Sequence, residues 1–420
     1  LQLSGSVRAR YEALSGQPRA SVKEADQWLS LRTLVDLSYD AGPVRFFGEL
    51  QDSRVYLADA GSAISSNDVN AAELVQAYVA ATFKDVAGAG SRLDGQLGRF
   101  TLNLGSRRLV AADDYRNTTN GVTGAKLDFK WRSGTTVTAF YTLPQTRLPD
   151  ALGSVLDNGI RWDRESSAVE LYGASLLAPQ RLAGGSLETL WLRYQERDAP
   201  GRPTKDRNLT TWDLRWFRDP AAGHWDWEVE AALQDGRAST GTSASAPVKD
   251  VAANFVHLRL GYQWAGGWKP RLGLDVDRAS GEDNGLKSHR FDTLLGMRRS
   301  DFAPSGLYNL VGRANILSPG IRLEATPAPR LDVLATARAL YLASSRDAFS
   351  TIGIRDARGL SGDHAGTQFD ARVRYWLVPR KLRLDVGGIL LAKGRFLREA
   401  PGTRQDGNVT FLNIAVQANF

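Results

Sequence analysis

Apolar and polar residues alternate along this chain with a period of two. In residues 225–234 the odd positions hold Trp, Val, Ala and Leu, whereas most even positions hold Asp, Glu or Gln. Residues 331–341 and 368–377 show a similar alternation. Because successive side chains of a β-strand point to opposite faces, this pattern predicts strands with one apolar and one polar face.

The alternation recurs along the whole chain and predicts eighteen strands. The fourth of them, residues 73–84, could also form a helix, and the irregular alternation at Arg99 and Phe100 predicts a bulge in the fifth. The predicted strands cover residues 1–13, 26–39, 43–52, 73–84, 91–104, 122–131, 135–142, 166–176, 186–196, 208–217, 224–235, 252–264, 270–278, 315–325, 331–342, 367–377, 381–391 and 408–420.

The connections between these strands alternate in length. Those after even-numbered strands are mostly short, such as residues 40–42, 132–134 and 378–380. Many of those after odd-numbered strands are long: residues 53–72, 105–121, 143–165, 279–314 and 343–366. We therefore predict an all-β fold, a transmembrane antiparallel β-barrel of about 18 strands with short periplasmic turns and long extracellular loops. Residues 1–420 would form it as a single domain in a bacterial outer membrane.

Strand length and aromatic placement separate this prediction from a soluble sandwich or propeller. Many predicted strands have about 10–13 residues, which fits a tilted membrane span better than the ~5–6 residues of an ordinary strand. No apolar run approaches the roughly 20 residues of a transmembrane helix. The last strand ends on Phe420, which resembles the assembly signal of bacterial outer-membrane proteins. An aromatic girdle is predicted near the periplasmic ends, from Tyr39, Phe83, Trp131, Trp216, Trp225, Trp227, Tyr262, Trp264 and Tyr375.

Composition excludes several classes of function. The chain has no Cys, which excludes disulfide scaffolds, Cys-based zinc sites and thiol catalysis. Its four His residues lie far apart in the sequence, which argues against a His-rich metal centre. The net charge is +7, but basic residues are scattered and form no long run, so we expect no nucleic-acid partner. Because the only Met is Met297 and the chain opens on Leu1, we expect a mature sequence whose signal peptide has been removed.

The polar face of a barrel of this size would line a water-filled lumen. Arg dominates the cations on that face, although acidic residues nearly balance it, so many of these charges could be structural ion pairs. A guanidinium stays charged and presents a planar fork to carboxylate or phosphate, and rings of Arg favour anions. Long loops folded inward, among them 53–72, 105–121 and 279–314, would narrow the lumen. The predicted constriction residues are Arg8, Arg10, Arg32, Arg193, Arg215, Arg259, Arg322, Arg338, Arg372 and Arg374.

Other chemistry has less support in the sequence. Asp275, Asp277, Glu282 and Asp283 could offer oxygen ligands to Ca²⁺, but a solvated acidic loop explains them more simply because nothing fixes the six or more oxygens that Ca²⁺ takes. An outer-membrane hydrolase would need a Ser or Asp beside a His at the rim, whereas His257 falls on the lumen face. We predict no enzymatic activity and no cofactor.

Several segments are similar to the alginate export family of outer-membrane barrels. They are Gly98–Phe100 and Gly105–Val110 followed by Arg116–Asn120, then Asp275–Asp283, and Phe291–Leu295 followed by Gly312–Ile316. The resemblance implies an 18-stranded monomeric barrel with an electropositive, Arg-lined constriction that passes a polyuronate. Exporters of this family carry an extended periplasmic segment near the C-terminal end that can plug the pore. Here the corresponding turn, Val378-Pro379-Arg380, is minimal.

These observations give a functional hypothesis with two alternatives. The chain would be a passive outer-membrane channel for anionic solutes, such as an acidic oligo- or polysaccharide. There are two alternatives. The chain could be a general or small-anion uptake porin, or a receptor or adhesin that acts through its long loops. The expected partners are outer-membrane lipid and lipopolysaccharide, the barrel assembly machinery through Phe420, and an anionic saccharide or small anion. Export and uptake both fit these residues.

Overall fold

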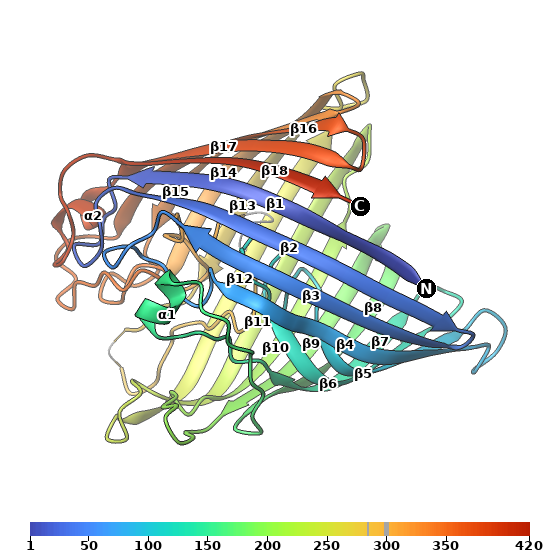
Figure 1. Cartoon of the computed structure of the whole chain (residues 1–420). Coiled ribbons are helices and arrows are strands. Elements are labelled where there is room, and N and C mark those ends of the chain that lie inside the picture. The colour runs from blue at the N-terminus through green and yellow to red at the C-terminus, as the bar shows by residue number, and fades with distance from the viewer. Residues whose placement is uncertain (284, 298–301) are drawn as a thin grey trace.

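Eighteen antiparallel strands form one closed sheet in this computed structural model, which describes residues 1–283, 285–297 and 302–420 (Figure 1). Each strand pairs with its sequence neighbours, and the last strand pairs with the first. At this closure the main-chain N–H of Gly5 donates to the carbonyl of Phe420 at 3.0 Å, and the reverse bond has the same length. The strands are β1 (Gln2–Ser15), β2 (Asp26–Ala41), β3 (Val44–Tyr56), β4 (Asn70–Lys84), β5 (Arg92–Thr101), β6 (Gly121–Lys130), β7 (Thr136–Pro144), β8 (Val169–Leu182), β9 (Gly185–Glu196), β10 (Asn208–Arg218), β11 (His224–Ser239), β12 (Val248–Gln263), β13 (Arg271–Ala279), β14 (Ile316–Ala328), β15 (Leu331–Tyr341), β16 (His364–Val378), β17 (Leu382–Lys393) and β18 (Val409–Asn419).

All eighteen strands predicted from the alternation are confirmed, although their ends differ by a few residues. The segment that could have been a helix is the strand β4. The bulge predicted at Arg99 and Phe100 is wrong, because both residues pair with β6 in unbroken register. Gly98 just before them has a φ of 129°, so a local twist replaces an inserted residue. The register shifts in this region fall between β3 and β4, the first of them between Glu49 and Leu50.

The two ends of the barrel differ as the connection lengths predict. One end, which we call the turn end, carries the short connections after even-numbered strands together with both chain termini (Figure 1). The other, the loop end, carries the long connections and the helices α1 (Leu152–Leu156) and α2 (Arg395–Glu399). Neither of these helices, nor any other in the described part of the chain, is long and apolar enough to span a membrane.

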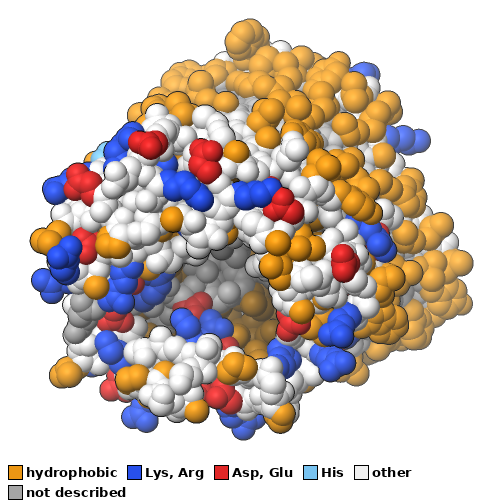
Figure 2. Space-filling view, turned by 60° about the vertical axis from the view of Figure 1, so that its left-hand side comes forward, with side chains coloured by type: hydrophobic (Ala, Val, Ile, Leu, Met, Phe, Trp, Pro, Cys, Tyr) orange, Lys and Arg blue, Asp and Glu red, His pale blue; other side chains and the backbone are white. Residues whose placement is uncertain are grey.

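The outer face of the sheet is apolar. Leu97, Leu214 and Leu233 point outward, and 60%, 59% and 65% of their surfaces are exposed. Figure 2 shows charged side chains gathered at the loop end, which faces the viewer, and hydrophobic side chains covering the visible outer wall behind it. A contiguous apolar surface of this kind is stable only against hydrocarbon or another apolar surface. Members of the predicted girdle are exposed beside the short turns, among them Tyr39, Phe83, Trp131, Trp225, Trp264 and Tyr375.

The apolar core of the protein lies inside the barrel near the loop end, where long loops fold inward. The β13–β14 loop (residues 280–315) buries Leu307, Tyr308 and Leu310, and the β5–β6 loop (residues 102–120) buries Leu109 and Val110. This packing holds irregular backbone in a fixed position within an otherwise polar lumen. The loops therefore determine where the lumen is narrow.

Candidate functional site: the lumen and its inner loops

The β5–β6 and β13–β14 loops bind each other inside the barrel. Val110 forms a parallel bridge with Leu295. The N–H of Ala111 donates to the carbonyl of Leu295 at 3.1 Å, and the N–H of Leu295 donates to the carbonyl of Leu109 at 3.0 Å. The prediction that loops 105–121 and 279–314 fold inward is thus confirmed for their described residues. Residues 284 and 298–301, which belong to the predicted loop 279–314, lie outside the described chain.

The β5–β6 loop spans the lumen and is attached to opposite sides of the wall. Arg108 donates from Nη1 to Oε1 of Glu228 on β11 at 2.7 Å and also pairs with Glu230. On β1 and β2, Arg8 donates to the carbonyl of Arg116 at 2.9 Å and Arg32 to the same carbonyl at 3.1 Å. Because β1 and β11 lie half a circuit apart in the closed sheet, the loop forms a bar across the lumen.

Six arginines converge on one side of the lumen beneath this bar. They line a cavity of about 430 Å³ together with two acids, Asp114 and Asp385, so the lining carries an excess of four positive charges. Tyr115 and Met297 of the inner loops form part of the same lining. We call this side the basic wall and define it by Arg8, Arg10, Arg32, Arg372, Arg374 and Arg383.

Several charges of the basic wall lack an acidic partner. Arg8 lies directly opposite Arg32 in the pairing of β1 with β2, where like charges destabilise a sheet. Neither has a carboxylate within ion-pair distance among the described residues; both donate to main-chain carbonyls instead. Arg374 and Arg383 share the single carboxylate of Asp385, at 2.8 and 2.7 Å. A fold that needed only structural ion pairs would not oppose two arginines here.

The basic wall also holds unused hydrogen-bond donors. The Nε atoms of Arg8, Arg10 and Arg32 are buried without an acceptor in the described part of the chain. A buried donor without a partner costs roughly 1–3 kcal/mol, so these three arginines hold their positions at a cost in stability.

The lumen wall formed by β10 to β14 is also rich in arginine, but carboxylates neutralise its arginines. Arg271 donates to Asp226 at 2.9 Å and to Glu324 at 2.6 Å. Arg215, Arg259 and Arg322 also pair with carboxylates, at 2.7, 2.6 and 2.7 Å. We call this side the paired wall and define it by Arg215, Arg259, Arg271 and Arg322. Its cavity of about 220 Å³ is lined by five basic and four acidic residues, which nearly cancel.

The two walls account for eight of the ten arginines predicted for the constriction. Arg8, Arg10, Arg32, Arg372 and Arg374 line the basic cavity. Arg215, Arg259 and Arg322 line the paired cavity. Three other arginines with important positions were not among the ten: Arg383 on the basic wall, Arg271 on the paired wall, and Arg108, which lies in a loop where alternation gives no signal.

The remaining two arginines do not line these cavities. Arg193 follows Trp191 on the outer face of β9, and Trp191 contacts the exposed Trp212, so the prediction that Arg193 faces the lumen is wrong. The inward residues Leu190 and Leu192 are apolar because they are buried under the inner loops, which inverts the expected polarity of β9. Arg338 does face inward, but it is covered by Phe302 at 4.7 Å and pairs with Asp277.

The four acids considered for Ca²⁺ each lie beside a basic side chain. Asp275 pairs with Arg259, and Asp277 accepts a hydrogen bond from Arg313 at 3.0 Å. The other two acids, Glu282 and Asp283, have basic neighbours of their own at 3.6 and 3.7 Å. Nowhere in the described chain do three or more metal-binding side chains converge.

One carboxyl group at the loop end titrates near neutral pH. Asp68, in the β3–β4 loop (residues 57–69), accepts hydrogen bonds from the N–H and the hydroxyl of Ser65, both at 3.1 Å. Burial raises the pKa of Asp68 to about 6, and the nearby charge of Glu12 adds to the rise. Asp68 also lies close enough to Arg10 to act on its charge. Ionisation of Asp68 therefore lowers the positive excess beside the basic wall.

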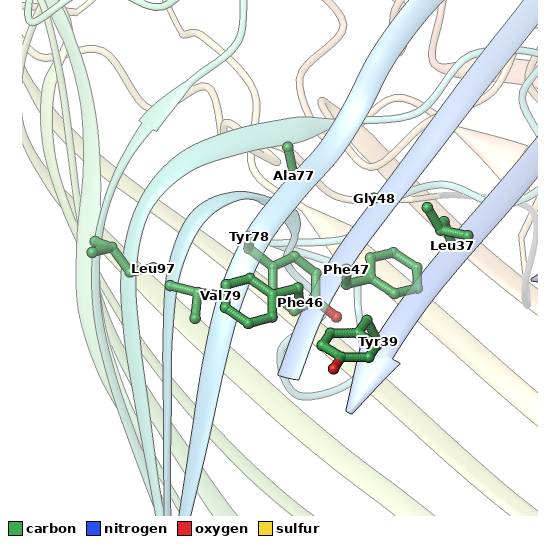
Figure 3. Close-up of a pocket in the computed structure, with 9 residues that line it drawn as sticks. All are labelled: Leu37, Tyr39, Phe46, Phe47, Gly48, Ala77, Tyr78, Val79 and Leu97. Carbon is green, nitrogen blue, oxygen red and sulfur yellow. The ribbon is translucent and has the colours of Figure 1, made fainter. Parts of the chain in front are cut away.

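A further groove lies on the outer face and not in the lumen (Figure 3). It forms over Gly48 and Ala77, whose small side chains leave a depression between larger apolar ones. Such a groove faces hydrocarbon and offers no path for a polar solute. Its lining residues are Leu37, Tyr39, Phe46, Phe47, Gly48, Ala77, Tyr78, Val79 and Leu97.

Comparison with known proteins supports the architecture and identifies the family. No curated protein matches the chain in sequence. Among solved structures it is similar to Pseudomonas aeruginosa OccK9 (OpdG), with a TM-score of 0.59 at 14% identity, covering 100% of this chain and 97% of that one. The outer membrane protein OpdK of the same organism gives 0.59 at 10% identity, covering 100% and 99%. P. aeruginosa OccK2 (OpdF) in complex with glucuronate gives 0.57 at 13% identity, covering 100% and 98%.

These structural similarities show the fold, and a sequence profile shows the family. The profile described as alginate export matches residues 1–410, nearly the whole chain. The match agrees with the closed barrel, its apolar outer face and its girdle of aromatic residues. The chain therefore belongs to the alginate export family of bacterial outer-membrane β-barrels.

Proposed function

We propose that this protein is a passive outer-membrane channel for anionic solutes and not an enzyme. The observation that carries the proposal is the basic wall, where six arginines face two acids across one continuous cavity. Arginines on a wetted, low-dielectric wall attract anions and repel cations, and a narrow lumen strengthens this field. The paired wall lines a separate cavity whose charges nearly balance, so it does not cancel that field.

The finer proposal is that the solute is an acidic saccharide, such as a polyuronate. A guanidinium binds a carboxylate through two parallel hydrogen bonds, and successive arginines on β16 and β1 could hold successive carboxylates. Two of the comparisons support this class: the family is described by alginate export, and OccK2 was crystallised with glucuronate. Both are properties of related proteins, and the recordings described below test whether this chain shares them.

Transport would proceed by exchange of partners along the basic wall. An anion entering from the loop end would pass the bar formed by the β5–β6 loop and exchange water for the guanidinium groups that line the cavity, those of Arg8, Arg10 and Arg32. Arg372 and Arg374 line both this cavity and the next one toward the turn end, so they could pass the anion onward. Weak binding at several sites allows both entry and release.

Single-channel recording in a planar bilayer tests the proposal. We expect a reversal potential under a salt gradient that shows anion preference, and block by uronate oligomers but not by neutral oligomers of the same length. Arg372→Ala with Arg374→Ala should reduce both effects. Because Arg383 continues to pair with Asp385, this variant should still fold. A cation-selective reversal potential, or no conductance at all, would contradict the channel.

A matched control uses two arginines on the outer rim. Arg278→Ala with Arg346→Ala removes the same number of charges from the loop end without touching the lumen cavities. This control should leave selectivity and uronate block unchanged. Anion selectivity without preferential uronate block would favour the small-anion porin. If the variant Arg372→Ala with Arg374→Ala keeps both anion selectivity and uronate block, these two residues do not take part in permeation.

A further inference from the structure

A polar groove lies on the outer rim of the barrel at the loop end. It has a volume of about 540 Å³ and is formed where β13 ends and the residues after β13 and β15 meet. Its basic lining residues are Arg278, His289 and Arg346, and its hydroxyl groups come from Ser280, Ser344 and Ser345. This combination of guanidinium and hydroxyl donors suits a phosphate or a sulfate group.

The groove faces away from the lumen. Asp277 points inward, where it pairs with Arg313, so the next residue on the strand, Arg278, points outward. Directly beside Arg278 on β14 lies Leu317, and four residues toward the turn end on β13 lies Leu274. Both leucines are exposed on the apolar outer face. Arg278 therefore lies where the apolar belt ends.

Both guanidinium groups of the groove lack an acidic partner among the described residues. Arg278 donates only to the neutral amide of Asn254, at 2.5 Å. For the side chain of Arg346 the structure shows no hydrogen bond or ion pair within the described chain. The one acid in the lining, Asp283, lies 3.7 Å from His289. Two adjacent positive charges thus remain for a ligand.

We propose that this groove binds a phosphate of the glycolipid headgroup of the outer leaflet, the phosphorylated glucosamine of lipid A. The height of the groove supports this source over a soluble anion, because a lipid anchored along Leu274 and Leu317 carries its phosphate to the level of Arg278. Arg278 and Arg346 would bind the phosphate oxygens, and the serine hydroxyls would bind the sugar. The site would fix the barrel's height and rotation in the membrane.

Native mass spectrometry of the full, delipidated barrel in detergent tests this site. The probes are diphosphorylated lipid A and the same lipid without its phosphates. We expect the wild type to bind the phosphorylated lipid, and Arg278→Ala with Arg346→Ala to weaken that binding at least about tenfold, the loss of two charge-assisted contacts. Arg278→Lys with Arg346→Lys should recover part of the affinity, because Lys keeps the positive charge but lacks the planar guanidinium.

A control pair separates a built site from general surface charge. Arg237 and Arg395 are also exposed at the loop end, but each pairs with an acid, Asp250 at 3.1 Å and Glu399 at 2.8 Å. Changing both to Ala should leave lipid binding unchanged. Equal binding by the Arg278 and Arg346 variant, equal loss in the control, or equal affinity for the dephosphorylated lipid would each overturn the proposal. Displacement of the lipid by soluble uronate oligomers would also overturn it, in favour of a saccharide site.

Discussion

The basic wall and the paired wall contain similar numbers of arginines, yet the two walls use them differently. On the paired wall Arg271 bridges Asp226 and Glu324, and its position is fixed by carboxylates on both sides. On the basic wall Arg8 faces Arg32 across two paired strands and binds only loop carbonyls. The cavity of the basic wall has six arginines and two acids, whereas that of the paired wall has five arginines and four acids. The neighbouring strand decides whether an arginine stabilises the wall or remains available to a solute.

This comparison predicts that mutations on the two walls have separable effects. Loss of an arginine from the paired wall leaves a buried carboxylate without its partner, which costs stability. Loss of an arginine from the basic wall removes hydrogen bonds to loop carbonyls but also relieves like-charge repulsion, so it should cost less stability while weakening the electric field that an anion meets.

The largest effect is expected from Arg271→Met on the paired wall. Asp226 would remain buried without its partner, and the free energy of unfolding should fall by about 3–5 kcal/mol. Urea unfolding of the refolded barrel, followed by tryptophan fluorescence, measures this loss. Adding Asp226→Asn to the variant should restore part of it. A loss below about 1 kcal/mol would mean that the pairs on this wall are solvated and contribute as surface ion pairs do.

A smaller effect on stability but a larger one on permeation is expected from Arg8→Gln with Arg32→Gln. The ratio of anion to cation permeability should fall by about fivefold, which corresponds to roughly 1 kcal/mol. The free energy of unfolding should fall by only about 1–3 kcal/mol, because the carbonyls of Asp114 and Arg116 lose donors but no acid is left unpaired. Reversal potentials and urea unfolding on the same samples test both parts. A stability loss as large as that of Arg271→Met would erase the distinction between the walls.

The β5–β6 loop connects the two walls, and Arg108→Ala should detach it from the paired wall. Because Glu228 and Glu230 lose a buried partner, local opening of the loop should become easier by about 1–3 kcal/mol. Faster amide exchange in residues 106–111 and a larger mean conductance would show this. The neighbouring Arg107 provides the control, since its pair with Asp114 is far more exposed. Unchanged exchange in the Arg108 variant would show that loop packing alone holds the bar.

The smallest effect is expected from pH. Asp68 has a pKa of about 6, so it is neutral below that pH and negative above it. As pH rises from 5 to 7.5, the added negative charge near Arg10 should lower anion preference by less than about twofold, after screening by salt. Asp68→Asn should flatten this part of the pH profile. An identical slope in wild type and variant would assign the titration to other groups.

Local pattern was a good guide to the strands and a poor guide to individual arginines. Alternation located β4 and even the short β13, because period two is a property of each strand alone. It failed at Arg193, since the inner loops bury Leu190 and Leu192 and thereby place apolar residues on both faces of β9. It also could not show that Asp275 and Asp277 have basic partners on other segments instead of a metal.

The sequence by itself determined the barrel: the number of strands, the apolar outer face, the short and long ends, and an arginine-rich lumen. These follow from residue spacing within single strands and from connection lengths. Only the tertiary structure decided which arginines are neutralised, because ion pairing depends on register between strands far apart in the chain. It also decided that Arg108 and the carbonyl of Arg116 hold one loop across the lumen. The physical reason is the distance over which each effect acts. Alternation depends on neighbouring residues of one strand, whereas the electric field inside the lumen depends on contacts that form only when the sheet closes.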